Sequence, residues 1–114
     1  MKRNILIYIK DILENMENAL NFVGNLSYEE FSKDKKINYA VVRCIEIIGE
    51  AAKNIPEDVR NKYPEIPWKE MAGMRDKVIH FYFDVDFKKV WLVVQRDIPQ
   101  LKPLLQKILE DLKS

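Results

Sequence analysis

Residues 4–23 read NILIYIKDILENMENALNFV, and this stretch decides the fold class. Its apolar side chains recur every three or four residues, which is the spacing of one face of an α-helix. Gly24 and Asn25 follow directly, and a glycine in this place commonly ends a helix. The stretch therefore predicts one long amphipathic helix near the start of the sequence.

The same periodicity, read together with capping signals, predicts helices along the rest of the chain. Ser27 and Glu30 have the spacing of a capping box, which starts a helix. Pro67 stands just before Trp68, where a proline favours the first turn of a helix. Strand signals are nearly absent, so we expect an all-α fold. The expected helices after the first cover residues 27–32, 36–54, 57–62, 68–81 and 87–96, with a further one from 97, and residues 33–36 are expected to form a charged connection.

The second long helix, residues 36–54, presents two different faces. Arg43, Glu46 and Glu50 share one side at spacings of three and four, as in surface ion pairs. Gly49 costs helix stability relative to alanine, and its simplest purpose is the close approach of another helix. The apolar face is expected to consist of Tyr39, Val42, Ile45, Ile48, Ala52 and Ile55, with Val41, Cys44 and Ile47 widening it.

The C-terminal part has two interpretations. In the first, Asp86 caps a helix over residues 87–96 and Asp97 caps a further one, in which Pro103 produces a kink. In the second, residues 87–112 form one long bent helix. With short connections and no internal repeat, both interpretations predict a four-to-five-helix up-and-down bundle in a single domain, residues 1–114.

The composition excludes several classes of protein. Of 114 residues, 19 are lysine or arginine and 18 are aspartate or glutamate, so the net charge is +1. A near-neutral chain with ordinary apolar content is neither a disordered tail nor a strongly basic nucleic-acid coat. Cys44 is alone, so a disulfide scaffold is impossible. Uninterrupted apolar runs such as Ile5–Ile9 are too short to span a membrane, and we expect a cytoplasmic protein.

Large apolar side chains are concentrated in residues 68–94, and a bundle of this size is expected to bury only part of them. We therefore expect a homodimer, most simply with two-fold symmetry, that covers the remainder. The alternative is that all of them enter one core. The side chains concerned are Trp68, Met71, Met74, Val78, Ile79, Phe81, Phe83, Phe87, Val90, Trp91 and Val94.

Candidate chemistry gathers around His80, the one histidine of the chain. Arg75 offers a planar guanidinium that matches a phosphate, and His80 exchanges protons near neutral pH. Asp76, four residues before His80, is placed to accept the imidazole N–H, and Tyr82 adds a phenol. In an ideal helix Arg75 and His80 point about 140° apart, so they meet only if the helix ends or unwinds near His80, or if two copies form a shared cleft.

Two further points bear on this cluster. The sequence has no His and Cys set for zinc and no glycine-rich phosphate loop, so no metal site is expected. A histidine near a helix end also has an ordinary structural explanation, as a cap or as an exposed side chain.

The spacing R-x-x-x-x-H-x-Y of Arg75, His80 and Tyr82 resembles the signature of the HEPN superfamily. More closely, the chain resembles the HepT-like ribonuclease toxins of the HepT–MntA type of toxin–antitoxin system. The resemblance covers most of the chain, because further segments match the family's pattern in order. These segments are 45–52, 67–68, 71–76, 82–83, 85–86, 90–91 and 97–101.

The resemblance implies a HEPN-like helical homodimer with the motif at a cleft between subunits, and a metal-independent endoribonuclease without a cofactor. His80 would be the general acid and base, and Arg75 would stabilise charge on the scissile phosphate, so that attack by the ribose 2′-OH leaves a 2′,3′-cyclic phosphate. Asp76 would orient the site. Tyr82 would receive AMP from a partner, a minimal nucleotidyltransferase antitoxin of the MntA kind, in a complex with the dimer. Phe81 departs from the family's small or variable residue and would narrow the cleft or pack in the dimer.

Two other functions stay open. The first is a non-catalytic nucleotide-binding partner of a minimal nucleotidyltransferase. The near-zero net charge favours it, because the sequence lacks the excess of basic residues with which a protein contacts many phosphates of RNA. The second is a helical dimer in which the motif only builds the interface.

Overall fold

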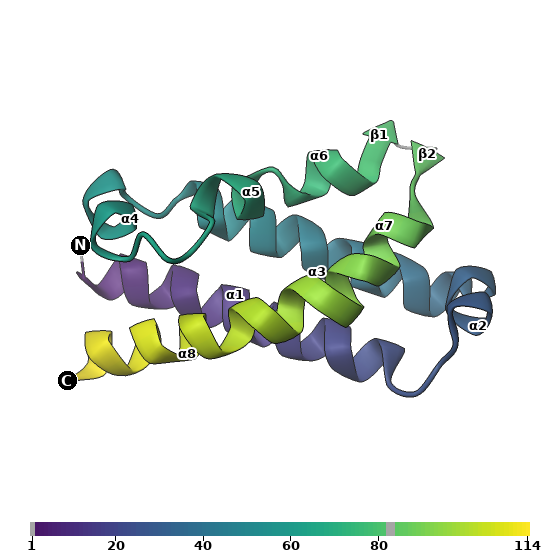
Figure 1. Cartoon of the computed structure of the whole chain (residues 1–114), viewed down its shortest axis with the longest axis horizontal. Coiled ribbons are helices and arrows are strands. Elements are labelled where there is room, and N and C mark those ends of the chain that lie inside the picture. The colour runs from purple at the N-terminus through teal and green to yellow at the C-terminus, as the bar shows by residue number, and fades with distance from the viewer. Residues whose placement is uncertain (1, 82–83) are drawn as a thin grey trace.

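The computed structural model describes residues 2–81 and 84–114, and most of them are helical. Four long segments run in alternating directions and form an up-and-down bundle (Figure 1). The short helices α2 (Tyr28–Lys33) and α4 (Glu57–Lys62) lie at opposite ends of it. The long segments are α1 (Lys2–Val23), α3 (Lys35–Lys53), α5 with α6 (Trp68–Ala72 and Met74–Val78), and α7 with η1 and α8 (Phe87–Leu92, Val93–Asp97 and Ile98–Lys113). The predicted helical bundle is thus confirmed in its main part.

The first turn between helices follows the capping signals in the sequence. Gly24 adopts φ +52°, which glycine accepts without strain, and its N–H donates to the Leu20 carbonyl at 2.9 Å at the end of α1. The Ser27 hydroxyl accepts the Glu30 N–H at 3.1 Å, and the Glu30 carboxylate accepts the Ser27 N–H at 2.9 Å. Both halves of the predicted capping box are therefore present.

The predicted charged connection over residues 33–36 is wrong, because Asp34 alone separates α2 from α3. One residue suffices since its backbone N–H caps α2 while its carboxylate accepts the N–H of the third residue of α3 at 3.1 Å. Asn38, buried in the following turn, donates from its side chain to the carbonyls of Phe31 and Ser32, both at 3.2 Å. These bonds tie the end of α2 to α3.

The predicted helix over residues 68–81 is confirmed over most of residues 68–78 but is wrong in its continuity and in its last residues. It is interrupted at Gly73 and ends at Val78, and Ile79–Phe81 (β1) pairs antiparallel with Asp84–Val85 (β2). The physical reason is that β-branched and aromatic side chains follow one another here, and these fit a strand better than a helix. The Asp86 N–H then donates to the Val78 carbonyl at 2.7 Å, which gives the end of α6 a backbone partner.

The C-terminal part follows the second interpretation, because α7, η1 and α8 form one unbroken helical segment with a π-helical stretch in its middle. Asp86 caps α7 by accepting the N–H of the helix's third residue at 3.1 Å, as predicted. The predicted cap by Asp97 is wrong, because this residue lies within the helical segment with φ −72° and ψ −48°. Its carboxylate instead contacts Arg96 (3.2 Å) and Lys77 on α6 (3.8 Å).

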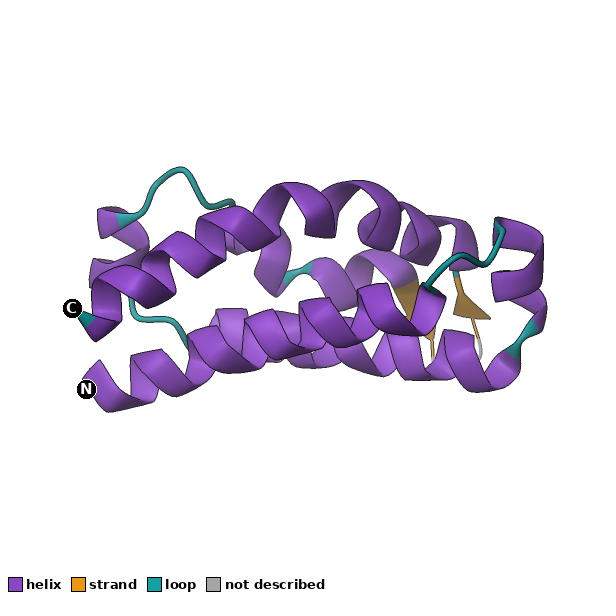
Figure 2. Ribbon diagram, turned by 90° about the horizontal axis from the view of Figure 1, so that it is seen from below, coloured by secondary structure: helices purple, strands orange, loops and turns teal. Residues whose placement is uncertain are grey.

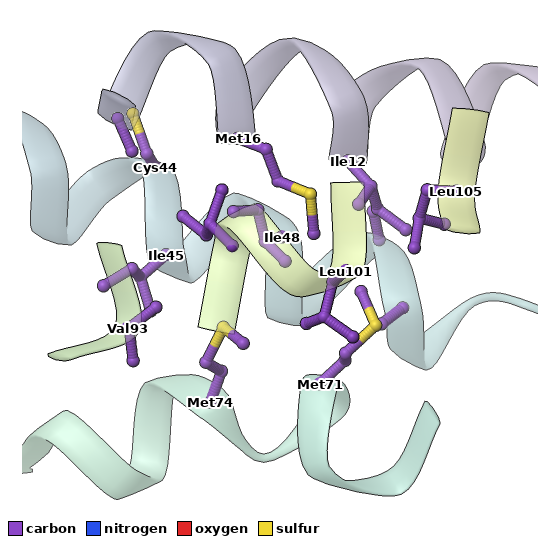
Figure 3. Close-up of a cluster of buried hydrophobic side chains, with 14 of the residues drawn as sticks. Ile12, Met16, Cys44, Ile45, Ile48, Met71, Met74, Val93, Leu101 and Leu105 are labelled. Carbon is purple, nitrogen blue, oxygen red and sulfur yellow. The ribbon is translucent and has the colours of Figure 1, made fainter. Parts of the chain in front are cut away.

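Side chains from every long segment meet in one core, as Figure 3 shows. Long and branched aliphatic side chains dominate it, and burial of this kind is the main favourable contribution to folding. The labelled members, all buried, are Ile12 and Met16 from α1, Cys44, Ile45 and Ile48 from α3, Met71 and Met74 from α5 and α6, and Val93, Leu101 and Leu105 from the C-terminal segment.

Most of the apolar side chains of residues 68–94 enter this core within a single chain. Phe87 and Trp91 are half-buried, while Phe81 is 63% exposed. Those buried are Trp68, Met71, Met74, Val78, Ile79, Val90 and Val94. Phe83 lies outside the described residues, as does Tyr82. One core therefore accommodates most of the set, and the homodimer stays a prediction.

The predicted apolar face of α3 is wrong at its first member. Tyr39 is 67% exposed and Val42 is half-buried, whereas Val41 is fully buried. The buried face of α3 is rotated away from Tyr39, toward α1. This leaves an aromatic ring on the surface, next to the hairpin of β1 and β2.

The two ends of the chain lie together at one end of the bundle, and the hairpin lies at the other (Figures 1 and 2). Among the described residues, no helix combines the length and the hydropathy that crossing a membrane would require.

Candidate active site around Arg75

A close contact between helices places Arg75 near the start of α6. A Cβ atom built on Gly49 of α3 would lie 3.4 Å from the carbonyl oxygens of Met71 and Ala72, and 3.8 Å from the backbone nitrogen of Arg75. The absence of a side chain at Gly49 therefore lets α3 approach α5 and α6, which confirms the purpose predicted for this glycine. It also brings the polar side of α3 alongside Arg75.

The Arg75 guanidinium lies between two carboxylates. Its Nε is 3.7 Å from Oε2 of Glu46 on α3, and its Nη1 is 3.2 Å from Oδ1 of the neighbouring Asp76. Glu46 Oε1 is in turn 3.9 Å from Nη1 of Arg43. The Arg75 side chain is 47% exposed, and ion pairs at such exposure stabilise weakly. A phosphate group could replace either carboxylate at low cost.

Two surface grooves meet at Arg75 and Glu46. The first, here called the polar groove, has a volume of about 410 Å³ and also contains Asp11, Arg43 and Glu50. The second, here called the apolar groove, has a volume of about 290 Å³. Its other lining residues are Tyr39, Val42, Ile79, Val85 and Phe87. The ion pair of Arg75 with Glu46 thus borders a charged hollow on one side and an apolar hollow on the other.

His80 lies on β1 and is exposed. Because α6 ends at Val78 and Ile79 is extended (φ −118°, ψ 112°), the angle of an ideal helix no longer applies between Arg75 and His80. The condition set by the sequence, that the helix ends near His80, is met. Within the described part of one chain, however, His80 lines neither groove and forms no hydrogen bond with Arg75 or Asp76.

The predicted site residues thus fall into three groups. Arg75 and Asp76 are in contact with each other. His80 is solvent-exposed on the strand that follows, and Tyr82 lies outside the described residues. One chain brings together the guanidinium and the carboxylate but leaves the imidazole separate from them.

Glu46 was not predicted as part of this site. Its spacing from Arg43 correctly indicates an ion pair along α3, but its contact with Arg75 joins helices that are far apart in sequence. The available signal was the segment 45–52, which contains Glu46 and matches the family pattern. Tyr39 was likewise missed, because its helical spacing placed it in the core.

Other chemically active groups lie outside the two grooves. Burial raises the pKa of the Cys44 thiol. Burial also raises the pKa of Tyr63, and the carboxylates of Asp111 and Glu65 raise it further. Across residues 2–81 and 84–114, no three His, Cys, Asp or Glu side chains gather in a way that could hold a metal ion.

A model of the family described as "Ribonuclease HepT-like" matches residues 12–108. The chain belongs to the HepT-like ribonuclease family. The resemblance seen in the sequence is thereby confirmed, as is the expected class of enzyme, a ribonuclease.

Several relatives of this ribonuclease family are similar over nearly their whole length. A Methanocaldococcus jannaschii protein named "Putative RNase MJ1216" is 54% identical over 113 residues, which are 99% of this chain and 93% of that protein. Another from the same organism, "Putative RNase MJ0125", is 52% identical over 99% of this chain and 97% of its own length. "Probable ribonuclease HepT" of Thermococcus cleftensis is 50% identical over 95% of this chain and 98% of its own length. No solved structure matches the chain significantly.

Proposed function

We propose that the chain is a metal-independent endoribonuclease, the toxin of a toxin–antitoxin pair, whose Arg75 and His80 act at a cleft shared by two copies. The observation that carries the proposal is a half-exposed guanidinium whose partners within the described part of the chain are surface ion pairs, with the one imidazole of the sequence exposed on the strand that follows. Membership of a ribonuclease family supports RNA as the substrate.

The proposed reaction is an intramolecular transesterification. His80 removes the proton of a ribose 2′-OH, the 2′-oxygen forms a bond to the adjacent phosphorus, and the bond from phosphorus to the 5′-oxygen breaks. The leaving oxygen takes up a proton, so the products carry a 2′,3′-cyclic phosphate and a 5′-OH. Arg75 stabilises the negative charge that grows on the phosphoryl oxygens. Asp76 orients the Arg75 guanidinium, which it contacts at 3.2 Å.

A second copy supplies what one chain lacks. Arg75 and His80 are not in contact within one chain, and a two-fold axis near the hairpin would bring the Arg75 of each copy toward the His80 of the other. Each dimer would then contain two composite sites.

The proposal is tested by RNA cleavage in EDTA with the purified chain and with the variants Arg75→Ala and His80→Ala. Both variants should lose activity, while Arg96→Ala, a control arginine whose side chain contacts Asp97, should keep it. Equal cleavage by all four proteins would remove the proposal.

Mixing the two inactive variants tests the shared cleft. Random exchange of subunits makes half of the dimers mixed, and each mixed dimer holds one intact site out of two, so about a quarter of the original activity should return. Sites formed within one chain would give no recovery.

The regulatory part of the proposal concerns Tyr82. Its hydroxyl would attack the α-phosphorus of ATP bound to a minimal nucleotidyltransferase antitoxin, with release of diphosphate, and the AMP would add bulk and negative charge beside the site. Mass spectrometry after co-expression should show one added AMP, which Tyr82→Phe abolishes. An unmodified wild-type chain would contradict this part alone.

A non-catalytic nucleotide-binding role is the second candidate. It is favoured by the balanced charge around Arg75, where two carboxylates lie within 4 Å of the guanidinium. Calorimetry with ATP and with short RNA separates the two functions, because nucleotide affinity without RNA turnover supports the second.

A further inference from the structure

The apolar groove lies directly beside the guanidinium proposed to hold the scissile phosphate. Its walls come from two parts of the chain that are distant in sequence. Tyr39 and Val42 belong to α3, whereas Ile79 and Val85 belong to the hairpin of β1 and β2 and Phe87 begins α7. Arg75 and Glu46 close the groove at its charged end. A ligand suited to this groove is therefore apolar over most of its surface and carries a group that can contact Arg75.

Tyr39 is the feature of the groove that the fold does not explain. Tyr39 is 67% exposed although neighbouring positions of α3, such as Val41, lie in the core. Tyr39, Val42 and Glu46 are spaced by three and four residues, so they lie along one face of α3 and lead from the exposed ring to the ion pair with Arg75. An aromatic ring exposed in line with a phosphate-binding arginine is the arrangement with which proteins bind single-stranded nucleic acid.

We infer that the apolar groove binds one unpaired RNA base, stacked on Tyr39, from a nucleotide whose phosphate contacts Arg75. This inference rests on the proposed function, and it specifies the substrate as single-stranded RNA at the cleavage point. The bases of a duplex are stacked on one another and cannot reach such a groove, whereas an unpaired base can turn outward and stack on an aromatic side chain.

A second copy of the chain is the competing occupant. The charged end of the groove argues against it, because charged residues are depleted in the buried centre of protein interfaces. The guanidinium of Arg75 instead complements the phosphate that every nucleotide carries.

The test uses the His80→Ala chain, which should bind RNA without cutting it, and single-stranded RNA with one 2-aminopurine whose fluorescence falls on stacking. Binding should quench the fluorescence, and adding Tyr39→Ala should weaken binding about tenfold and remove the quenching, while Tyr39→Phe preserves both. Phe22→Ala is the matched control, because Phe22 is an exposed aromatic residue (43%) on α1 that lines neither groove.

An RNA with an abasic nucleotide at the same position isolates the contact. Loss of the base should weaken binding about tenfold with Tyr39 present and leave it unchanged with Tyr39→Ala, because each change removes the same stacking contact. Independent, additive losses would overturn the inference.

Two outcomes separate this inference from the proposed function. If RNA cleavage requires Arg75 and His80 but is unchanged by Tyr39→Ala, only the inference that the apolar groove binds a base is overturned. If RNA binding quenches the fluorescence and depends on Tyr39, but the wild-type chain never cleaves RNA, the base-binding role of the apolar groove is supported and the ribonuclease mechanism is contradicted. If Tyr39→Ala instead converts a dimer to monomers in light scattering, a second copy occupies the groove and the inference is overturned.

Discussion

The contact between Glu46 and Arg75 leads to a prediction with a definite sign. In Glu46→Gln the carboxylate becomes an amide of nearly the same shape, so the packing of α3 against α6 is kept while one negative charge is removed. Arg75 then loses a charged competitor for phosphate. We expect the variant to bind RNA more tightly than the wild-type chain.

The size of the effect follows from the geometry. Two unit charges 3.7 Å apart attract by about 1 kcal/mol at the dielectric constant of water. This screened value is appropriate because the side chains of Arg75 and Glu46 are 47% and 32% exposed. A gain of about 1 kcal/mol corresponds to roughly fivefold tighter binding. The gain should shrink at 1 M salt, where the Debye length is about 3 Å.

Turnover should respond in the opposite direction. Tighter binding of the ground state does not accelerate the chemical step, and Arg75 is less firmly oriented without the Glu46 carboxylate. We therefore expect KM to fall and kcat to fall with it.

The assay is fluorescence anisotropy with a short single-stranded RNA at low and high salt, followed by steady-state cleavage kinetics. Glu50→Gln is the matched control, because Glu50 lies in the same polar groove and on the same helix but forms no ion pair with Arg75 in the described part of the chain. Equal tightening by both variants would show that only the overall charge matters and would refute the argument. Weaker binding by Glu46→Gln would refute it as well.

Four further predictions concern stability and reactivity. Asn38→Ala removes the side-chain donor to the Phe31 and Ser32 carbonyls, of which Phe31 keeps the Asp34 N–H at 3.3 Å, and should lower the free energy of unfolding by about 1 kcal/mol, measured with urea; an unchanged midpoint would contradict this. At Gly49 the Cβ atom of alanine would lie 3.4 Å from backbone oxygens, so the free energy of unfolding of Gly49→Ala should stay within about 1 kcal/mol of the wild-type value. The larger side chain of Gly49→Val should push α3 away from α6 and lower both the melting temperature and the rate of RNA cleavage. A fully active valine variant would argue against the contact. The pKa of Tyr63 is raised in the folded state, so above pH 10.0 the unfolded state loses the phenol proton while the folded state keeps it. The contribution of Tyr63 to the free energy of unfolding is therefore complete below pH 10.0 and is lost as the pH rises further. The melting temperature of Tyr63→Phe should fall less steeply with pH in that range than the melting temperature of the wild type. The buried Cys44 thiol, with its raised pKa, should react with a thiol reagent at pH 8 only after urea unfolding, and rapid labelling of the folded chain would show that the core opens.

The long helices were predictable because their signals are local. Apolar spacing, the capping box at Ser27 and the glycine at the end of α1 involve residues within a few positions of one another. The end of α6 was not, because residues 68–81 also keep a helical spacing of apolar side chains. Only the pairing of Ile79 with Val85, a contact across the hairpin, decides that the chain leaves the helix there.

The site was predictable residue by residue but not as an arrangement. Arg75, Asp76 and His80 were found by their types and spacing, and the structure places the first two in contact. The partners from α3 were out of reach, since spacing along one helix says nothing of which helix faces it. Gly49 is the exception, because a glycine within a long helix indicates a close neighbour without naming it.

The N-terminus and the C-terminus lie at the end of the bundle opposite to the hairpin. An affinity tag, a fluorescent protein or a linker to a solid support can therefore be joined at either end without covering the hairpin that carries His80. Chains joined to a support at either end can therefore still pair near the hairpin, where the proposed two-fold axis lies, which makes surface-based binding measurements practical for every variant described above.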